Sequence, residues 1–206
     1  MNFLLRIIAL CLFGFTAAAL AQALGPEELV QKVTEEVMTS IKSDKQLAAG
    51  DKQKAMKVAE EKVLPYIDFE EATRLAVGRA WSQATPEQRK KLVSEFRNML
   101  VRTYSNAIEA YQGQTLKVMP SRGGKQDAKD EATVRTQFTR AGGKPLPIEF
   151  QMRKTGETWK VYDIAVEGIS LVLTYRSEFD SVVKQDGIDG LIKRLTEKNS
   201  PAALKK

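Results

Sequence analysis

The 206-residue chain has no histidine and a single cysteine, Cys11. Histidine is the commonest general base and the commonest zinc ligand, so its absence excludes Ser-His and Cys-His catalytic arrangements and most zinc sites. Cys11 lies in an N-terminal segment that we expect to be removed. The mature chain then has no disulfide, thiolate nucleophile or cysteine-based metal site, and we expect neither a metal nor a cofactor.

Residues 1–23 have the composition of a secretory signal peptide. Arg6 supplies a positive start, "IIALCLFGFTAAAL" is the apolar middle, and A-x-A cleavage patterns end at Ala21 and Ala23. The apolar run is shorter than the roughly 20 residues that span a bilayer, which disfavours the alternative of a retained anchor. We predict a cleaved signal peptide at 1–23 and one domain at 24–206.

The remaining chain is basic and has the composition of an ordinary globular domain. The whole sequence is 43% hydrophobic and 28% charged, with a formal net charge of +6 that becomes +5 when Arg6 is removed. Outside the cytoplasm, a basic surface meets anionic lipid headgroups more often than nucleic acid. We therefore expect no nucleic-acid partner.

Helical periodicity dominates the first half of the chain. Apolar residues recur at every fourth position from Leu29 onward, directly after Pro26, a residue suited to the first turn of a helix. The segment 85–111 has the clearest signal, because Thr85 and Gln88 have capping-box spacing and an apolar stripe follows. Shorter helices are expected over 51–64 and 68–77, between Ser170 and Gly187, and after Gly187.

Between residues 114 and 166 the apolar period changes to two, which is typical of strands. The segments 131–139 and 147–154 alternate cleanly, and 115–119 is a weaker strand. The fourth, "WKVYDIAV" at 159–166, has apolar side chains at both odd and even positions, which predicts two apolar faces. Helices, then hairpin-linked strands, then helices predict an α+β domain. We expect its sheet to close over the long helix and leave an apolar slot.

Three motifs suggest chemistry but have simpler interpretations. The Gly-Gly-Lys triplets at 123–125 and 142–144 lack Walker spacing, so hairpin turns are favoured over a phosphate loop. Ser170 lacks the second glycine of a nucleophile elbow and is expected to form a turn or a helix cap. Asp163 lies between apolar neighbours; an arginine partner is favoured over a role as a general base.

Two long segments carry a family resemblance. The run "VLPYIDFEEATRLAVGRAW" at 63–81 and the run "VEGISLVLTYR" at 166–176, together with "TPEQ" at 85–88, closely resemble the toluene-tolerance or MlaC family of periplasmic phospholipid-binding proteins. The resemblance extends over nearly all of the chain after residue 23. It implies a cone similar to nuclear transport factor 2 (NTF2-like), in which helices wrap a curved, mainly four-stranded antiparallel sheet around an internal hydrophobic cavity.

The same resemblance implies a function and a location. Members carry phospholipid through the periplasm between an outer-membrane lipoprotein-porin complex and an inner-membrane ABC transporter complex with a lipid-binding periplasmic subunit. We therefore expect a monomeric lipid carrier that is not an enzyme and whose phospholipid is cargo. The alternative is an isomerase or hydrolase of similar architecture that uses Asp163 and a tyrosine.

The residues expected to contact lipid come from the apolar stripes and strand faces. Guanidinium groups match phosphate geometry, so Arg79, Arg102 and Arg176 are candidates for the headgroup, with plain surface charge as the alternative for each. The predicted lining of the cavity is Leu75, Phe96, Leu100, Tyr104, Ile108, Phe138, Phe150, Met152, Tyr162, Ile164, Val166, Ile169, Leu171 and Tyr175.

Overall fold

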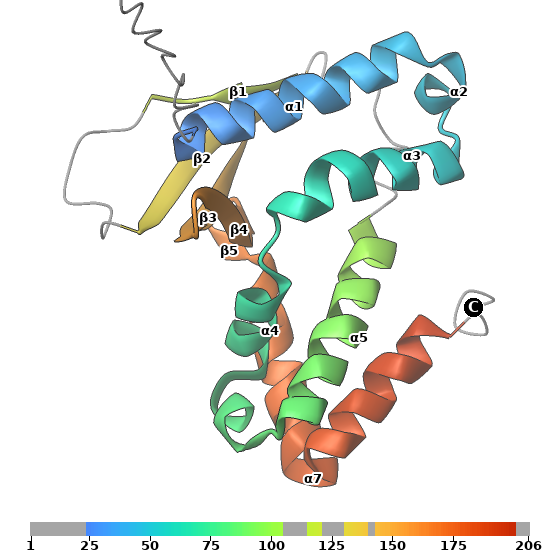
Figure 1. The fold of residues 1–206 in the computed structure, drawn as a ribbon, viewed down its shortest axis with the longest axis vertical. Coiled ribbons are helices and arrows are strands. Elements are labelled where there is room, and N and C mark those ends of the chain that lie inside the picture. The colour runs from blue at the N-terminus through green and yellow to red at the C-terminus, as the bar shows by residue number, and fades with distance from the viewer. Residues whose placement is uncertain (1–23, 105–114, 121–129, 140–142, 201–206) are drawn as a thin grey trace, which may run out of the picture.

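The computed structural model describes residues 24–104, 115–120, 130–139 and 143–200, which form two regions (Figure 1). The sheet region consists of the helix α1 (Pro26–Ser43) and an antiparallel sheet. The helical region consists of α4 (Phe69–Val77), α5 (Pro86–Tyr104) and α7 (Leu171–Asn199). The short α2 (Lys45–Ala48) and α3 (Lys52–Val58) follow α1, and α3 lies between the regions in the view of Figure 1.

The sheet confirms the α+β prediction and adds one strand to it. Strand order follows chain order, and each neighbouring pair is antiparallel. The fifth strand has only two residues, where the sequence predicted a mainly four-stranded sheet. The strands are β1 (Thr115–Val118), β2 (Glu131–Thr139), β3 (Leu146–Thr155), β4 (Thr158–Val166) and β5 (Ile169–Ser170).

Strand β4 contains a β-bulge that explains its unusual sequence. Phe150 of β3 pairs with Ile164, and Met152 pairs with Val161, so β4 has one residue more than β3 between the two pairs. Because an extra residue inverts the alternation of side chains, Val161 and Ile164 face the same side of the sheet. The prediction that Val161 and Ile164 lie on opposite faces of β4 is therefore wrong. Tyr162 is the extra residue of the bulge and has no partner on β3.

The apolar face of the sheet is covered by α1. Leu29 and Val30 of this helix pack with Val134, Met152 and Val161 in one buried cluster. The described part of the long helix, α5, packs mainly against α7 and α4, and its last turns line the same pocket as β4. Closure of the sheet over this helix stays a prediction. Sequence periodicity shows that a helix has an apolar stripe but not which partner covers it.

The helices of the helical region begin and end at the predicted signals. The Asp68 carboxylate accepts from the backbone N–H of Glu71 at 3.0 Å and caps α4. Thr85 and Gln88 form the predicted capping box, in which each side chain accepts a hydrogen bond from the other's backbone N–H. Gly187, with φ 70° and ψ −173°, interrupts α7, so its two arms meet at an angle (Figure 1).

Several predicted features lie outside the described residues. These are the signal peptide at 1–23, the part of the long helix beyond residue 104, and both Gly-Gly pairs of the proposed turns in whole or part. Among the helices that the structure describes, none is both long enough and apolar enough to cross a membrane.

Candidate functional site

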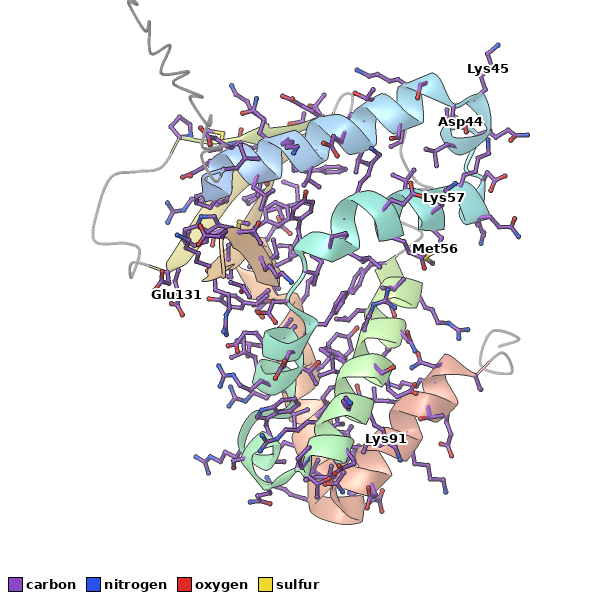
Figure 2. All side chains as sticks on the ribbon, in the orientation of Figure 1. Asp44, Lys45, Met56, Lys57, Lys91 and Glu131 are labelled. Atoms are coloured by element: carbon purple, nitrogen blue, oxygen red, sulfur yellow. The ribbon has the colours of Figure 1, made fainter. Side chains whose placement is uncertain are left out.

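A pocket of about 410 Å³ lies where the sheet region and the helical region face each other. Figure 2 shows side chains from α3, α5 and the strands gathered in this part of the molecule. Almost all groups at the pocket surface are hydrocarbon; the polar exceptions are two tyrosines and one aspartate. The lining residues are Val37, Ala59, Val63, Leu64, Ile67, Phe69, Ala72, Leu100, Val101, Tyr104, Val161, Tyr162, Asp163, Ile164, Leu171 and Val172.

Strand β4 forms the wall on the side of the sheet. Its four consecutive residues from Val161 to Ile164 all line the pocket, which a regular strand with strict alternation does not allow. The β-bulge makes this possible, because the residues around it no longer point to strictly alternate sides. A departure from regular geometry thus coincides with the pocket wall.

The segment before α4 is held against the free edge of β4. The backbone N–H of Asp68 donates to the carbonyl oxygen of Val161 at 2.8 Å, and Ile67 forms an isolated parallel bridge with Val161. These contacts place Ile67 and Phe69 at the pocket. The 63–69 stretch, quoted above for its family resemblance, therefore contributes a second wall.

A π-helical turn, η1 (Ala59–Val63), follows α3 and forms a third wall. Ala59 and Val63 line the pocket from this turn, and Leu64 continues the wall. Single π-helical turns occur frequently at functional sites. The sequence prediction included a helix over 51–64 but assigned none of these residues to the cavity. The four-residue spacing of Ala59 and Val63 was the available signal.

The helical region supplies the opposite side of the pocket. Leu100, Val101 and Tyr104 come from the last described turns of α5, and Leu171 and Val172 come from the first turn of α7. Val172 is buried, whereas Tyr104 is 40% exposed. The pocket therefore depends on how these two helix ends are held against β4.

Asp163 is the one carboxylate among the described residues that line the pocket, and it is only 8% exposed. One oxygen accepts from the backbone N–H groups of Ile164 at 2.8 Å and Val172 at 3.1 Å. The other accepts from the Ser170 hydroxyl at 2.5 Å. The prediction of an arginine partner is wrong for the described chain, because hydroxyl and backbone donors at the start of α7 satisfy this charge.

The tyrosines near the pocket are held in their neutral form. Burial raises the pKa of the Tyr162 hydroxyl, and nearby carboxylates, among them that of Glu131, the first residue of β2 (Figure 2), raise it further. Burial is also the main cause that raises the pKa of Tyr175, with a hydrogen bond to Tyr104 as the second. These phenols therefore add hydrogen-bonding groups to the apolar surroundings without adding charge.

A charged cluster beside the pocket joins the two regions. Glu71 of α4 accepts from Arg74 Nε at 2.8 Å, and Arg153 Nη1 of β3 lies 2.7 Å from the same carboxylate. The hydrogen bond from Arg74 is the main cause that lowers the pKa of Glu71, and the charge of Arg153 lowers it further. Arg153 Nε also lies 3.5 Å from Asp68 Oδ2. The cluster fixes the start of α4 against β3.

The structure brings part of the predicted lining together. Leu100, Tyr104, Tyr162, Ile164 and Leu171 line the pocket. Ile108 lies outside the described residues. The other eight lie elsewhere: Leu75, Phe96 and Tyr175 in the helical core, Phe150 and Met152 under α1, Phe138 and Val166 half-buried on β2 and β4, and Ile169 at 63% exposure in β5. Contact of any of the fourteen with lipid stays a prediction.

The three candidate headgroup arginines are not among the described residues that line the pocket. Arg79 is exposed in the short 3₁₀ helix η3 (Gly78–Gln83) that follows α4. Arg176 is exposed and lies over Gly78, so close that a methyl carbon added to this glycine would lie 3.0 Å from the Arg176 Nε. Arg102 donates to the backbone carbonyl of Asn199. Their contact with a headgroup stays a prediction.

Among the described residues, no group of three or more acidic, histidine or cysteine side chains is placed to hold a metal ion. The described lining is hydrocarbon apart from Tyr104, Tyr162 and Asp163. The site therefore has the properties of a pocket for a hydrocarbon ligand, with a few neutral hydroxyl groups at its walls.

Comparison with known proteins places the chain in a family. The chain is 34% identical in sequence to a phospholipid-binding protein from Ralstonia solanacearum, solved in complex with a phospholipid; the TM-score is 0.77, over 89% of this chain and all of that one. It is 26% identical to toluene tolerance protein ttg2D of Pseudomonas putida over 80% of this chain and 75% of that protein.

Two further matches extend over most of the chain. The intermembrane phospholipid transport system binding protein MlaC of Haemophilus influenzae is 23% identical, over 96% of this chain and 92% of that protein. The family model described as "MlaC protein" matches residues 31–197, which include every residue that lines the pocket. The chain therefore belongs to the MlaC protein family.

Proposed function

We propose that this protein is a lipid carrier that holds the acyl chains of a phospholipid in the apolar pocket between its two regions. The observation that carries the proposal is the pocket itself, about 410 Å³ in volume and lined almost entirely by hydrocarbon. This volume falls in the range of roughly 300–1,000 Å³ found for ligand pockets. The similar Ralstonia protein, solved with a phospholipid, supports the choice of ligand.

Such a carrier must offset a large free-energy cost of moving acyl chains through water. Exposing an acyl chain to water costs about 0.8 kcal/mol per CH₂ group, so two chains of ordinary length cost on the order of 20 kcal/mol. A carrier lowers this cost only when hydrocarbon replaces water around the chains. The lining meets that condition, and Tyr104, which is 40% exposed, supplies a hydroxyl group that we propose lies near the headgroup. We propose that sheet and helices form the NTF2-like cone around these chains.

The transport step is proposed from the relatives. One of them is named as the binding protein of an intermembrane phospholipid transport system. We propose that this chain is exported to the periplasm after loss of residues 1–23. There it acts as a monomer that shuttles phospholipid between an outer-membrane lipoprotein-porin complex and an inner-membrane ABC transporter complex.

The enzymatic alternative has less support from the site. A general base needs an oxygen that is free to take a proton from a ligand. A carboxylate has about four acceptor positions, and three of those of Asp163 already accept hydrogen bonds, two from backbone N–H groups and one from Ser170. We therefore propose no catalytic role for Asp163, no cofactor, and phospholipid as cargo rather than substrate.

Native mass spectrometry of the purified mature protein tests the proposal. The expected result is a non-covalent adduct with the mass of one diacyl phospholipid, which organic extraction removes and incubation with phospholipid vesicles restores. The untreated and extracted samples should differ only in this adduct. A protein that carries no lipid after purification, and takes up none from vesicles while its circular dichroism spectrum is that of a folded chain, would contradict the proposal.

A further inference from the structure

The proposed carrier function leaves the buried carboxylate of Asp163 without a role. A charged group in a hydrocarbon pocket is costly unless it is hydrogen-bonded, since burial without partners costs several kcal/mol. Asp163 lines the pocket, is 8% exposed, and accepts three hydrogen bonds. Two of these three donors lie outside β4: Ser170 ends β5 and caps α7, and Val172 lies in the first turn of α7. The carboxylate therefore serves a contact between elements.

This contact joins β4 to the first turn of α7. The backbone N–H of Val172 has no partner within the helix, because the first N–H groups of a helix lack a preceding carbonyl. The Asp163 carboxylate supplies the missing acceptor at 3.1 Å. Ser170 donates to the same carboxylate, and its hydroxyl oxygen accepts from the backbone N–H of Leu173 at 2.9 Å. One buried carboxylate and one hydroxyl thus fix the start of α7.

The start of α7 is also a wall of the pocket. Leu171 and Val172 line it from the helix, and Ile164 lines it from the strand next to Asp163. Between strand and helix the chain passes through the tight turn Glu167–Gly168, in which both residues have positive φ, 52° and 82°. This turn gives the two sides of the wall a short connection, and β5 pairs Ser170 with Ala165 of β4. The Asp163 hydrogen bonds extend this attachment to the first turn of α7.

We propose that Asp163 is a positioning residue that holds the first turn of α7 against β4 and so keeps the Leu171–Val172 wall closed on the ligand. The inference rests on the proposed function for the identity of that ligand. Val172 also belongs to the buried core of the helical region, and Ser170 pairs with Ala165 of β4, so the Asp163 contact acts together with these two constraints on the wall. Asp163 and Ser170 then control how fast the ligand leaves.

Substitutions of Ser170 test this contact with the smallest change to the pocket. Ser170→Ala removes the donor to Asp163, whereas Ser170→Thr keeps a hydroxyl group at the same place. Thr85→Ala is the matched control, because it removes a helix-capping hydroxyl of the same kind from α5, and Thr85 is not among the residues that line the pocket. Asp163→Asn, which keeps the size of the side chain, is a fourth variant.

We call the Asp163–Ser170 contact a latch if it holds the pocket wall closed on the ligand. Three readouts distinguish such a latch from an ordinary helix cap. The first is amide hydrogen exchange at Val172 in the ligand-free mature protein. The second is the rate at which a fluorescent phospholipid passes from the protein to excess phosphatidylcholine vesicles. The third is the dissociation rate of an apolar fluorescent dye from the pocket, which does not require that the natural ligand is a lipid.

We expect Ser170→Ala and Asp163→Asn to speed lipid and dye release by about tenfold or more, the factor that corresponds to loss of one hydrogen bond to a charged group. Val172 exchange should rise in parallel, and Ser170→Thr should stay within about twofold of the wild type. Thr85→Ala should lower the melting temperature comparably and leave both release rates unchanged.

Two results would overturn the latch. In the first, Val172 exchange rises while lipid and dye release stay unchanged, which would show a local helix cap. In the second, Thr85→Ala speeds release as much as Ser170→Ala, which would show a general loss of stability. A wild type that binds the dye in a Ser170-dependent way but never takes up phospholipid would overturn the proposed function and leave the latch standing.

Discussion

The sheet region and the helical region each have a filled core, and the pocket lies where the two meet. In the helical region, the ring of Phe96 packs edge-on against Tyr175 and Phe179, with centroid distances of 5.4 Å and 5.3 Å. In the sheet region, Met152 is fully buried under α1 beside Leu29. Neither core needs a ligand to complete it. Because both cores are filled, we expect the protein to fold without a ligand.

The largest expected effect comes from opening a hole in the helical core. Phe96→Ala removes a fully buried ring from its edge-to-face contacts, and we expect a loss of about 3–5 kcal/mol in the free energy of unfolding. Urea denaturation measures this loss. If the core and the pocket are separate, the lipid content per folded molecule stays that of the wild type. A fall in lipid content under conditions where the variant is fully folded would show that Phe96 belongs to the binding site.

The next effect comes from filling the pocket rather than emptying a core. Leu100→Trp adds an indole to a residue that lines the pocket. We expect lipid content to fall about tenfold or more, because the ring occupies volume that the acyl chains need. Native mass spectrometry measures the occupied fraction.

The matched control for this substitution is Leu173→Trp. Leu173 lies on α7, is 45% exposed, and is not part of the described pocket lining. It should keep its lipid. Equal lipid loss in both variants, or in neither, would contradict the assignment of the pocket to the acyl chains.

A smaller effect is expected at the bend between the two arms of α7. Gly187 has φ 70° and ψ −173°, a conformation that is essentially restricted to glycine, and no neighbour lies within 4 Å of a methyl group added there. Gly187→Ala should therefore cost about 1–3 kcal/mol through backbone strain alone. Thermal unfolding measures the loss. Unchanged stability would show that the bend is not fixed by the glycine, and a change in lipid content would show that it influences the pocket.

The smallest predicted effect depends on pH and concerns the charged cluster that joins the regions. The pKa of Glu71 is lowered from its ordinary value of 4.5. Its contribution to stability is therefore fully present above about pH 4.5 and is lost as the pH falls through the lower value in the folded protein. Glu71→Gln should lower the melting temperature by a few degrees at pH 7, as expected for a partly screened ion pair.

The difference between Glu71→Gln and the wild type should shrink as the pH falls from 5 toward 3, because only the wild type has a carboxylate to lose. Melting curves at several pH values measure this difference. A gap that stays constant over that range would show that Glu71 acts through packing and not through its charge.

Helix boundaries are predicted well because their signals are local. The Thr85 and Gln88 capping box, the Ser170 cap and the Gly187 bend all occur in the structure as the sequence indicates. Each depends on one side chain and its nearest backbone groups, so spacing in the sequence is enough to identify it. The alternation of β2 and β3 is likewise sufficient to place their apolar residues on one face.

The errors concern features set by contacts between distant parts of the chain. In the sequence the β4 bulge shows only as a shift of the apolar residues from odd positions, such as Val161, to even positions, such as Ile164. This pattern equally fits a regular strand with two apolar faces. The wall from Ala59 and Val63 depends on where α3 packs, which periodicity does not determine. The arginine expected at Asp163 is replaced by Ser170 and a helix N-terminus, because backbone donors leave no distinct residue pattern.

The central claim is that acyl chains occupy the space between the two regions, and photo-crosslinking tests it most directly. The mature protein would be loaded with a phospholipid that carries a diazirine near the end of an acyl chain, irradiated, digested and mapped by mass spectrometry. The account predicts crosslinks at pocket residues such as Ala72, Leu100 and Ile164, and their loss in Leu100→Trp. Crosslinks confined to the second arm of α7 or the outer side of α1, with none at the pocket, would contradict it.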